Sequence, residues 1–182
     1  SKVQVNGQEV TFASAGTIAS IYLTAQLSSE SVPIGSALIA PERTLKVATQ
    51  FVARVKTFSM LVPLLKGASL VFHRHAVDAP LRIAQIKAII NQKTKKVTKK
   101  NPEFIPQNSL ADVVFRLTQP LPVDLHNVSK SFGRFIIRAG GETLGFGSIT
   151  EVLQTEIPQS QDKWYKMMFI KKNKIKNSYI NN

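Results

Sequence analysis

The sequence predicts an all-β protein organised around a small, closed β-barrel. Apolar residues recur in short runs of period two, rich in β-branched and aromatic side chains and separated by glycine and proline. The clearest runs form a hairpin, with residues 131–138 as one arm and residues 143–152 as the other. Gly145 and Gly147 share one face of the second arm, where a missing Cβ lets a backbone or a bulky ring come close, as at a barrel corner. This pair favours a closed barrel over a flat sheet.

The start of the chain is expected to form a few short strands. Residues 3–12 alternate between apolar and polar around a turn at Gly7, and residues 17–24 and 32–39 are further strand candidates. Pro33 confines the last of these to a sheet edge or a strand start. So few strands cannot complete a barrel of their own.

From Thr49 the alternation becomes regular, and it turns Phe51 and Val55 to one side and Arg54 to the other. Further strands are expected before the hairpin at residues 69–75, 81–90 and 110–117. Residues 81–90 also fit a helical stripe, but the preceding Pro80 and the neighbouring strands favour a strand.

Composition sets the general class of the protein. The chain has 182 residues, 43% of them hydrophobic, which suffices for one ordinary domain or two small ones. The formal charge of +13 favours an anionic partner such as nucleic acid. There is no cysteine, no apolar run near the ~20 residues of a membrane span, and no signal-like start. We therefore expect a soluble cytoplasmic protein without a membrane partner.

The residues of the hairpin resemble a known family. Gly133-Arg134-Phe135, then Arg138, Thr143 and Gly147, look like the closing strands of the third domain of the elongation factor one-alpha and EF-Tu superfamily of translational GTPases. Residues 81–86 and 95–104 are similar to the same domain, and the likeness covers roughly residues 49–152. Within the superfamily, the sequence looks most like the ribosome-rescue GTPase that works with Pelota.

This resemblance implies a domain organisation. Residues 46–153 would form a closed six-stranded antiparallel barrel, the third domain of a translation factor. Residues 1–45 would be the C-terminal remnant of a second, incomplete barrel, or would pair on the following barrel to leave one compact unit. Residues 154–182 are basic and polar with no clear period, and are expected to be a disordered tail.

The resemblance also implies a function. The chain would be the C-terminal binding module of a ribosome-rescue GTPase, docking a Pelota-like protein and the ribosome, with GTP and magnesium bound by a domain absent from this chain. One alternative is a module of elongation factor one-alpha or of the release-factor GTPase, docking tRNA or release factor. Another is a stand-alone basic barrel that binds RNA or protein.

A basic loop and two arginines are the candidate contact residues. The lysines that fall on or beside one predicted hairpin are Lys87, Lys93, Lys95, Lys96, Lys99 and Lys100. Contact with ribosomal RNA and a merely solvated turn are equally good interpretations of them. Arg134 and Arg138 could meet acids of a partner, or could bridge to Asp112, Glu142 or Glu151, and we favour the structural role for Arg134.

Two turns depart from the family pattern. Lys95 stands where a turn glycine is usual, and residues 107–109 replace a customary Gly-Asp or Gly-Gln. The loop contacts that the family uses there are therefore in doubt.

Nothing in the sequence predicts chemistry within this chain. It holds no phosphate-loop motif, no Gly-x-Ser-x-Gly elbow and no paired acids, so no catalytic or cofactor-binding residue is expected. His73 and His75 lie two apart on a predicted strand and would share a face, as half of a metal site. No further ligand completes that site, and two surface histidines are the better interpretation.

Overall fold

The computed structural model describes residues 2–14, 16–22, 37 and 45–154. The chain divides into two compact units, Ser1–Pro33 and Ile34–Asn182. Two of the expected segments, the strand at residues 32–39 apart from Ala37 and the tail after Gln154, lie outside the described residues. No helix in the described part has the length and apolar character needed to cross a bilayer.

The N-terminal unit is a three-stranded antiparallel sheet. It consists of β1 (Lys2–Val5), β2 (Gln8–Val10) and β3 (Ala19–Tyr22) in the order β2-β1-β3. Asn6 and Gly7 make the first turn with φ of +51° and +79°, the left-handed conformation of a two-residue hairpin. No residue of this unit within 2–14 and 16–22 is fully buried.

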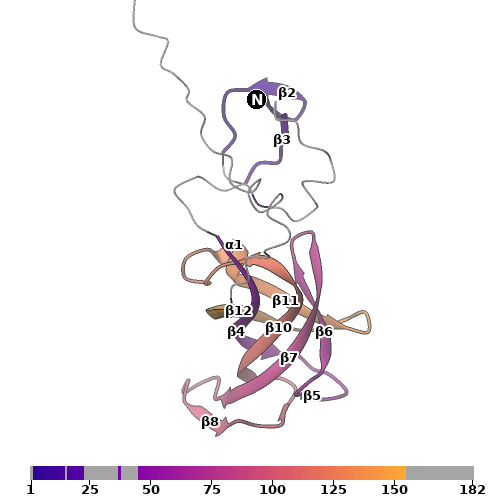
Figure 1. Ribbon diagram of the computed structural model, residues 1–182, viewed down its shortest axis with the longest axis vertical. Helices are drawn as coiled ribbons and strands as arrows, with labels where there is room; N and C mark the ends of the chain where they lie inside the picture. Colours follow the sequence, from indigo (N-terminus) through magenta and orange to yellow (C-terminus); the bar gives the residue numbers. More distant parts are fainter. Residues whose placement is uncertain (1, 15, 23–36, 38–44, 155–182) are drawn as a thin grey trace, which may run out of the picture. The chain divides into compact units, whose positions relative to one another are not determined.

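The second unit is a closed barrel of six antiparallel strands (Figure 1). The order is β10-β4-β12-β11-β6-β7, and β10 pairs with β7 to close it, which confirms the predicted fold class. The six strands are β4 (Lys46–Thr57), β6 (Ser69–Arg74), β7 (Val77–Ile90), β10 (Leu110–Val123), β11 (Arg134–Ala139) and β12 (Glu142–Gln154). Residues 81–90 are thus strand, as expected.

Three short strands lie outside the closed ring. β8 (Val97–Lys100) extends the sheet beyond β7, and β5 (Leu64–Leu65) pairs with β9 (Phe104–Ile105) in a separate two-stranded ribbon. All four residues of β8 are exposed.

Four phenylalanines form the centre of the barrel. Phe51 and Phe115 from β4 and β10 meet Phe72 and Phe135 from β6 and β11. The Phe72 and Phe135 rings stack with centroids 4.9 Å apart, and Phe51 lies edge-on to Phe135 at 5.5 Å. All four side chains are nearly or fully buried, so strands far apart in the sequence share one core.

The two glycines of β12 work as the sequence predicts. A Cβ on Gly145 would collide with the carbonyl oxygen of Lys56 on β4, and one on Gly147 would collide with the Phe135 ring. One glycine therefore admits a backbone and the other admits an aromatic ring, as a closing barrel requires.

The start of the predicted hairpin is wrong by three residues. Lys130–Gly133 form a single helical turn, α1, and β11 begins only at Arg134. Ser129 caps this turn, because its side chain accepts a hydrogen bond from the Phe132 N–H. Gly133 packs directly on the His126 backbone, where a Cβ would not fit.

Candidate functional site

The outer surface of the barrel carries an apolar patch. Ile136 on β11 pairs with His73 on β6 and with Phe146 on β12, and Phe146 pairs in turn with Lys56 on β4. Ile136 and Phe146 are 43% and 46% exposed, and the Phe58 ring packs on Phe146 at 5.9 Å between centroids. We call Ile136 and Phe146 the outer patch.

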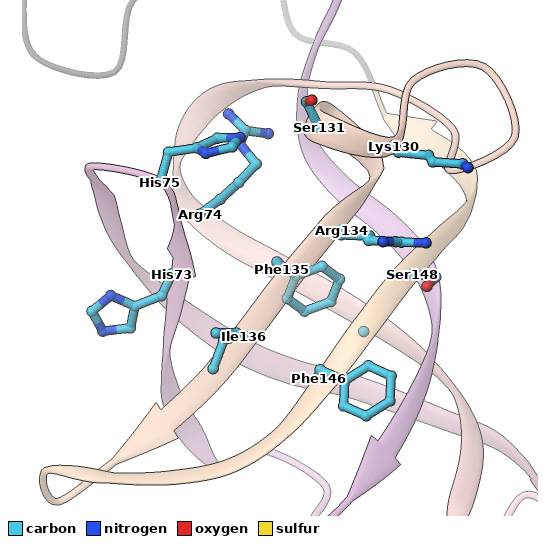
Figure 2. Close-up of a pocket in the computed structure, with 11 residues that line it drawn as sticks. His73, Arg74, His75, Lys130, Ser131, Arg134, Phe135, Ile136, Phe146 and Ser148 are labelled. Carbon is cyan, nitrogen blue, oxygen red and sulfur yellow. The ribbon is translucent and has the colours of Figure 1, made fainter. Parts of the chain in front are cut away.

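A groove of about 560 Å³ runs beside the outer patch, from the end of β6 to β12 (Figure 2). We call it the Arg134 groove. It is lined by His73, Arg74, His75, Lys130, Ser131, Arg134, Phe135, Ile136, Phe146, Gly147 and Ser148. Figure 2 shows Lys130 and Arg134 extending in the same direction, whereas Arg74 and His75 lie together at the end of β6. The lining contains no carboxylate.

Arg74 is a buried cation at one end of the Arg134 groove. Only 5% of the residue is exposed, and its Nη1 donates to the carbonyl oxygens of Pro122 at 2.7 Å and Phe132 at 3.3 Å. The guanidinium lies over the Phe132 and Phe72 rings, 4.9 and 5.6 Å from their centroids. Its Nε is buried without a hydrogen-bond partner. Burial lowers the pKa of Arg74 to about 10, so the side chain is still charged at neutral pH.

Arg134 and Arg138 form no ion pair with the acids considered as their structural partners, which are Asp112, Glu142 and Glu151. Asp112 instead holds Arg54 through two bonds of 2.9 and 3.0 Å, and the hydrogen bond to Asp112 raises the pKa of Arg54. Glu151 lies 3.6 Å from Lys87. Arg138 donates at 2.5 Å to the carbonyl oxygen of Gly141. Arg134 is exposed in the Arg134 groove and forms no ion pair among the described residues.

The predicted basic loop is the hairpin between β7 and β8, and we call it the basic hairpin. Asn91 builds its turn, because its side-chain oxygen accepts from the N–H groups of Lys93 and Thr94. Lys95 has φ of +58°, so it takes the left-handed conformation that glycine adopts most readily. The exposed lysines of the hairpin are Lys87, Lys93, Lys95, Lys96, Lys99 and Lys100.

A second groove, of about 520 Å³, lies on the other side of Phe146. Arg54 and Lys56 from β4 line it together with Lys95 from the basic hairpin. The structure therefore brings one predicted lysine to the outer sheet face, while Arg134 reaches the opposite side of Phe146. Arg138 lines neither groove.

The two histidines do not share a strand face as expected. β6 ends at Arg74, and His75 turns away with φ of +53°. The Nδ1 atom of His73 contacts the carboxylate of Asp78 on β7. In the described part of the chain, no group of three or more His, Asp or Glu residues lies close enough to hold a metal ion.

The comparison with protein families decides the family of this barrel. The family described as GTP-eEF1A C-terminal domain-like matches residues 50–150, more than half of the 182 residues. The chain belongs to this family. The matched region begins in β4 and ends in β12, so it takes in the whole closed ring. By this description the matched region is similar to a C-terminal domain of a translation factor.

Curated relatives place the chain among translation factors. It is 29% identical over 138 residues to Protein HBS1 of Drosophila melanogaster, covering 76% of this chain and 20% of that protein. It is 33% identical over 117 residues to Elongation factor 1-alpha of Ignicoccus hospitalis, covering 64% of this chain and 26% of that one. The chain thus spans about a quarter or less of these relatives.

Solved structures confirm the fold. Sup35 complexed with GMPPNP matches with a TM-score of 0.76 at 19% identity, covering 85% of this chain and 37% of that one. Sup35 complexed with GDP matches with a TM-score of 0.57 at 22% identity, covering 62% and 28%.

Sequence reasoning missed the outer patch and Arg74, although the sequence holds a signal for each. Ile136 stands between the inward Phe135 and Ile137, so strand alternation places it outside. Arg74 continues the inward series Leu70 and Phe72, so the same alternation places a charge inside. A charge at an inward position, or a large apolar residue at an outward one, is worth testing as a contact.

Proposed function

We propose that this chain is the C-terminal docking module of a translational GTPase that acts in ribosome rescue, and that its partner is a Pelota-like protein. The observation that carries the proposal is the family match over residues 50–150, together with the HBS1 match that reaches over 76% of the chain. The barrel itself supplies no phosphate-binding motif. GTP and magnesium would be bound by another domain of the parent protein.

The outer patch is the surface we assign to Pelota. Ile136 and Phe146 are neighbours on adjacent strands, each more than two-fifths exposed, and they stand on a rigid sheet. Half-exposed apolar side chains at the centre of a polar surface are typical of the core of a protein interface. The module would thus position the GTPase domain relative to its partner in the cytoplasm.

The basic hairpin is the surface we assign to ribosomal RNA. Its lysines are exposed, and a phosphate backbone that comes within the ~8 Å Debye length of them would be attracted by their charge. No aromatic residue lies among them to stack on bases, so binding would be salt-sensitive and independent of base sequence. Changing Lys95, Lys96, Lys99 and Lys100 to Glu should lower ribosome affinity in a low-salt pelleting assay; unchanged affinity would remove the ribosome contact from the proposal.

We also propose that the N-terminal sheet is the end of a second barrel, with its remaining strands upstream in the parent protein, and that residues 46–153 form the third domain. Ile21 and Tyr22 of β3 are 48% and 53% exposed, as expected for strands that lack their packing partners. The complete coding sequence tests this directly. A phosphate-loop domain upstream of Ser1 supports it, and a full coding sequence without one would favour a stand-alone barrel.

A binding comparison tests the partner. The full chain is offered a Pelota protein, elongator tRNA and a release factor side by side, and we expect Pelota to be retained. Phe146→Asp should weaken that capture about tenfold or more, because the partner would have to bury an unpaired carboxylate at the outer patch. Leu61→Asp is the matched control, because Leu61 is 99% exposed and lies outside the outer patch. Capture of release factor or tRNA alone would reject Pelota.

Elongator tRNA is the second candidate. It is favoured by the higher identity to Elongation factor 1-alpha, 33% against 29% for HBS1. In that case the wild-type chain would retain tRNA, and Phe146→Asp would have little effect.

A further inference from the structure

We propose that the Arg134 groove recognises an acidic side chain of the partner protein, adjacent to the apolar residue that covers the outer patch. This inference rests on the proposed function, because it specifies what kind of segment the partner presents. The occupant is a polypeptide that carries a carboxylate next to an apolar side chain.

The Arg134 groove carries unbalanced positive charge. Arg74, Lys130 and Arg134 all line the groove, and no carboxylate lines it. By contrast, two other cations of the outer barrel surface have acids beside them: Arg54 has Asp112, and Lys87 has Glu151. The groove therefore has a positive field that the described residues do not neutralise, and a carboxylate brought there would meet charge-assisted donors.

Arg74 places a buried charge at one end of the groove. Only 5% of the residue is exposed, its guanidinium lies among aromatic rings and carbonyl oxygens, and its Nε has no hydrogen-bond partner among the described residues. Low-dielectric surroundings screen a charge weakly, so Arg74 raises the potential of the groove more than an exposed lysine would. Its two bonds to the carbonyls of Pro122 and Phe132 also fix the end of β10 and α1, and α1 carries Lys130 and Ser131.

The apolar residues of the groove favour a polypeptide over RNA as its occupant. Ile136 and Phe146, the two residues of the outer patch, form an apolar wall of the groove, whereas Phe135 is only 3% exposed and belongs to the barrel core. A phosphate backbone would leave this wall in contact with charged oxygens and water. A peptide that places an aliphatic or aromatic side chain on the wall and a carboxylate near Arg134 uses both kinds of surface.

The test uses the full chain with a double charge reversal in the groove, Lys130→Glu with Arg134→Glu. Both side chains are exposed, so the fold should persist. The matched control reverses two exposed arginines that line neither groove and lie outside the basic hairpin, Arg82→Glu with Arg116→Glu, which changes the net charge equally. We expect the groove variant to raise the Kd for Pelota at least about tenfold and to flatten its salt dependence, and the control to change it less than about threefold.

A second measurement does not depend on Pelota. In an NMR titration, one of three ligands is added to the chain. The first is a synthetic hexapeptide with a Phe-Leu pair between acidic residues, the second is the same peptide with Gln and Asn in place of its acidic residues, and the third is a uridine oligonucleotide. We expect the acidic peptide to shift the amide signals of Ser131, Ile136 and Gly147, the amide peptide to leave them unchanged, and the groove variant to abolish the shifts.

The outcomes separate the two proposals. If Pelota does not bind but the acidic peptide shifts the groove, the partner is wrong and the groove specificity stands. If Pelota binds equally well to the groove variant and the acidic peptide shifts nothing there, the groove proposal is overturned and the docking function stands. Groove shifts caused by the oligonucleotide and not by the acidic peptide would assign the groove to RNA.

Discussion

The barrel and the N-terminal sheet use the same kind of sequence with opposite results. In both, apolar and polar residues alternate along short antiparallel strands. The closed ring turns Phe51, Phe72 and Phe135 into one core, whereas the described N-terminal sheet buries none of its residues fully. Period-two patterning therefore forms hairpins, but burial, and with it most of the stability, comes from closing the sheet.

The sharpest test of this difference changes one phenylalanine in each unit to alanine. Phe135→Ala removes a ring that contacts three others in the barrel core, and should lower the free energy of unfolding by about 3–5 kcal/mol. Phe12→Ala, in the N-terminal unit, should change it by less than about 0.5 kcal/mol because Phe12 is 78% exposed. Urea unfolding followed by circular dichroism measures both. Equal losses would contradict the distinction between the two units.

The glycines of β12 test how closure is achieved. Gly147→Ala should cost about 1–3 kcal/mol, because its Cβ meets the Phe135 ring. Adding Phe135→Leu should recover part of that loss in a double-mutant cycle, since a smaller side chain makes room. Gly145→Ala should not be recovered in this way, because its Cβ meets the Lys56 carbonyl. Full additivity in the Gly147 cycle would mean that the ring does not set the need for glycine.

Arg74 is a buried charge in the barrel, and its pH dependence is predictable. Burial lowers its folded-state pKa to about 10, well below the ordinary value of an arginine, so the charge opposes folding in full below pH 10. Above pH 10 the folded state releases the proton before the unfolded state does, and this penalty declines. The stability of the wild type relative to Arg74→Met should therefore rise from pH 9 to pH 11. Arg54→Met is the control, because the pKa of Arg54 is raised and no such gain is expected.

Turn conformation gives the smallest effect. Lys95 and Gly7 both have positive φ, in the barrel and in the N-terminal sheet, but Lys95 pays a steric cost that Gly7 avoids. Lys95→Gly should raise the free energy of unfolding by about 0.5–1 kcal/mol, which would appear as a slightly higher melting temperature of the barrel. Lys96→Gly, the neighbouring control without positive φ, should lower it. If both lower it, lost side-chain contacts outweigh backbone strain at Lys95.

Much of the fold followed from local pattern and from the resemblance. The strands, the closed ring and the role of Gly145 and Gly147 could all be predicted, because strand alternation and missing Cβ atoms act locally. Two local events were missed. One capped turn at Ser129 replaces the start of β11, and one left-handed residue, His75, ends the expected pair of strand histidines.

The candidate site was less predictable, because it depends on partners distant in the sequence. Arg134 was a candidate, yet its companions in the groove come from β6, α1 and β12. Which acids remain for Arg134 also depends on pairings such as Arg54 with Asp112, which are 58 residues apart. Sequence alternation shows which way a side chain points, and only the barrel's strand order shows what it meets.

The added strand β8 has a consequence for behaviour at high concentration. Ring closure leaves the six main strands without an open hydrogen-bonding edge, but β8 pairs only with β7 among the described strands. Its outer edge is therefore a place where a second molecule could add a strand, and Lys99 and Lys100 oppose such addition by like-charge repulsion. Raising the salt or neutralising these two lysines should promote self-association through this edge.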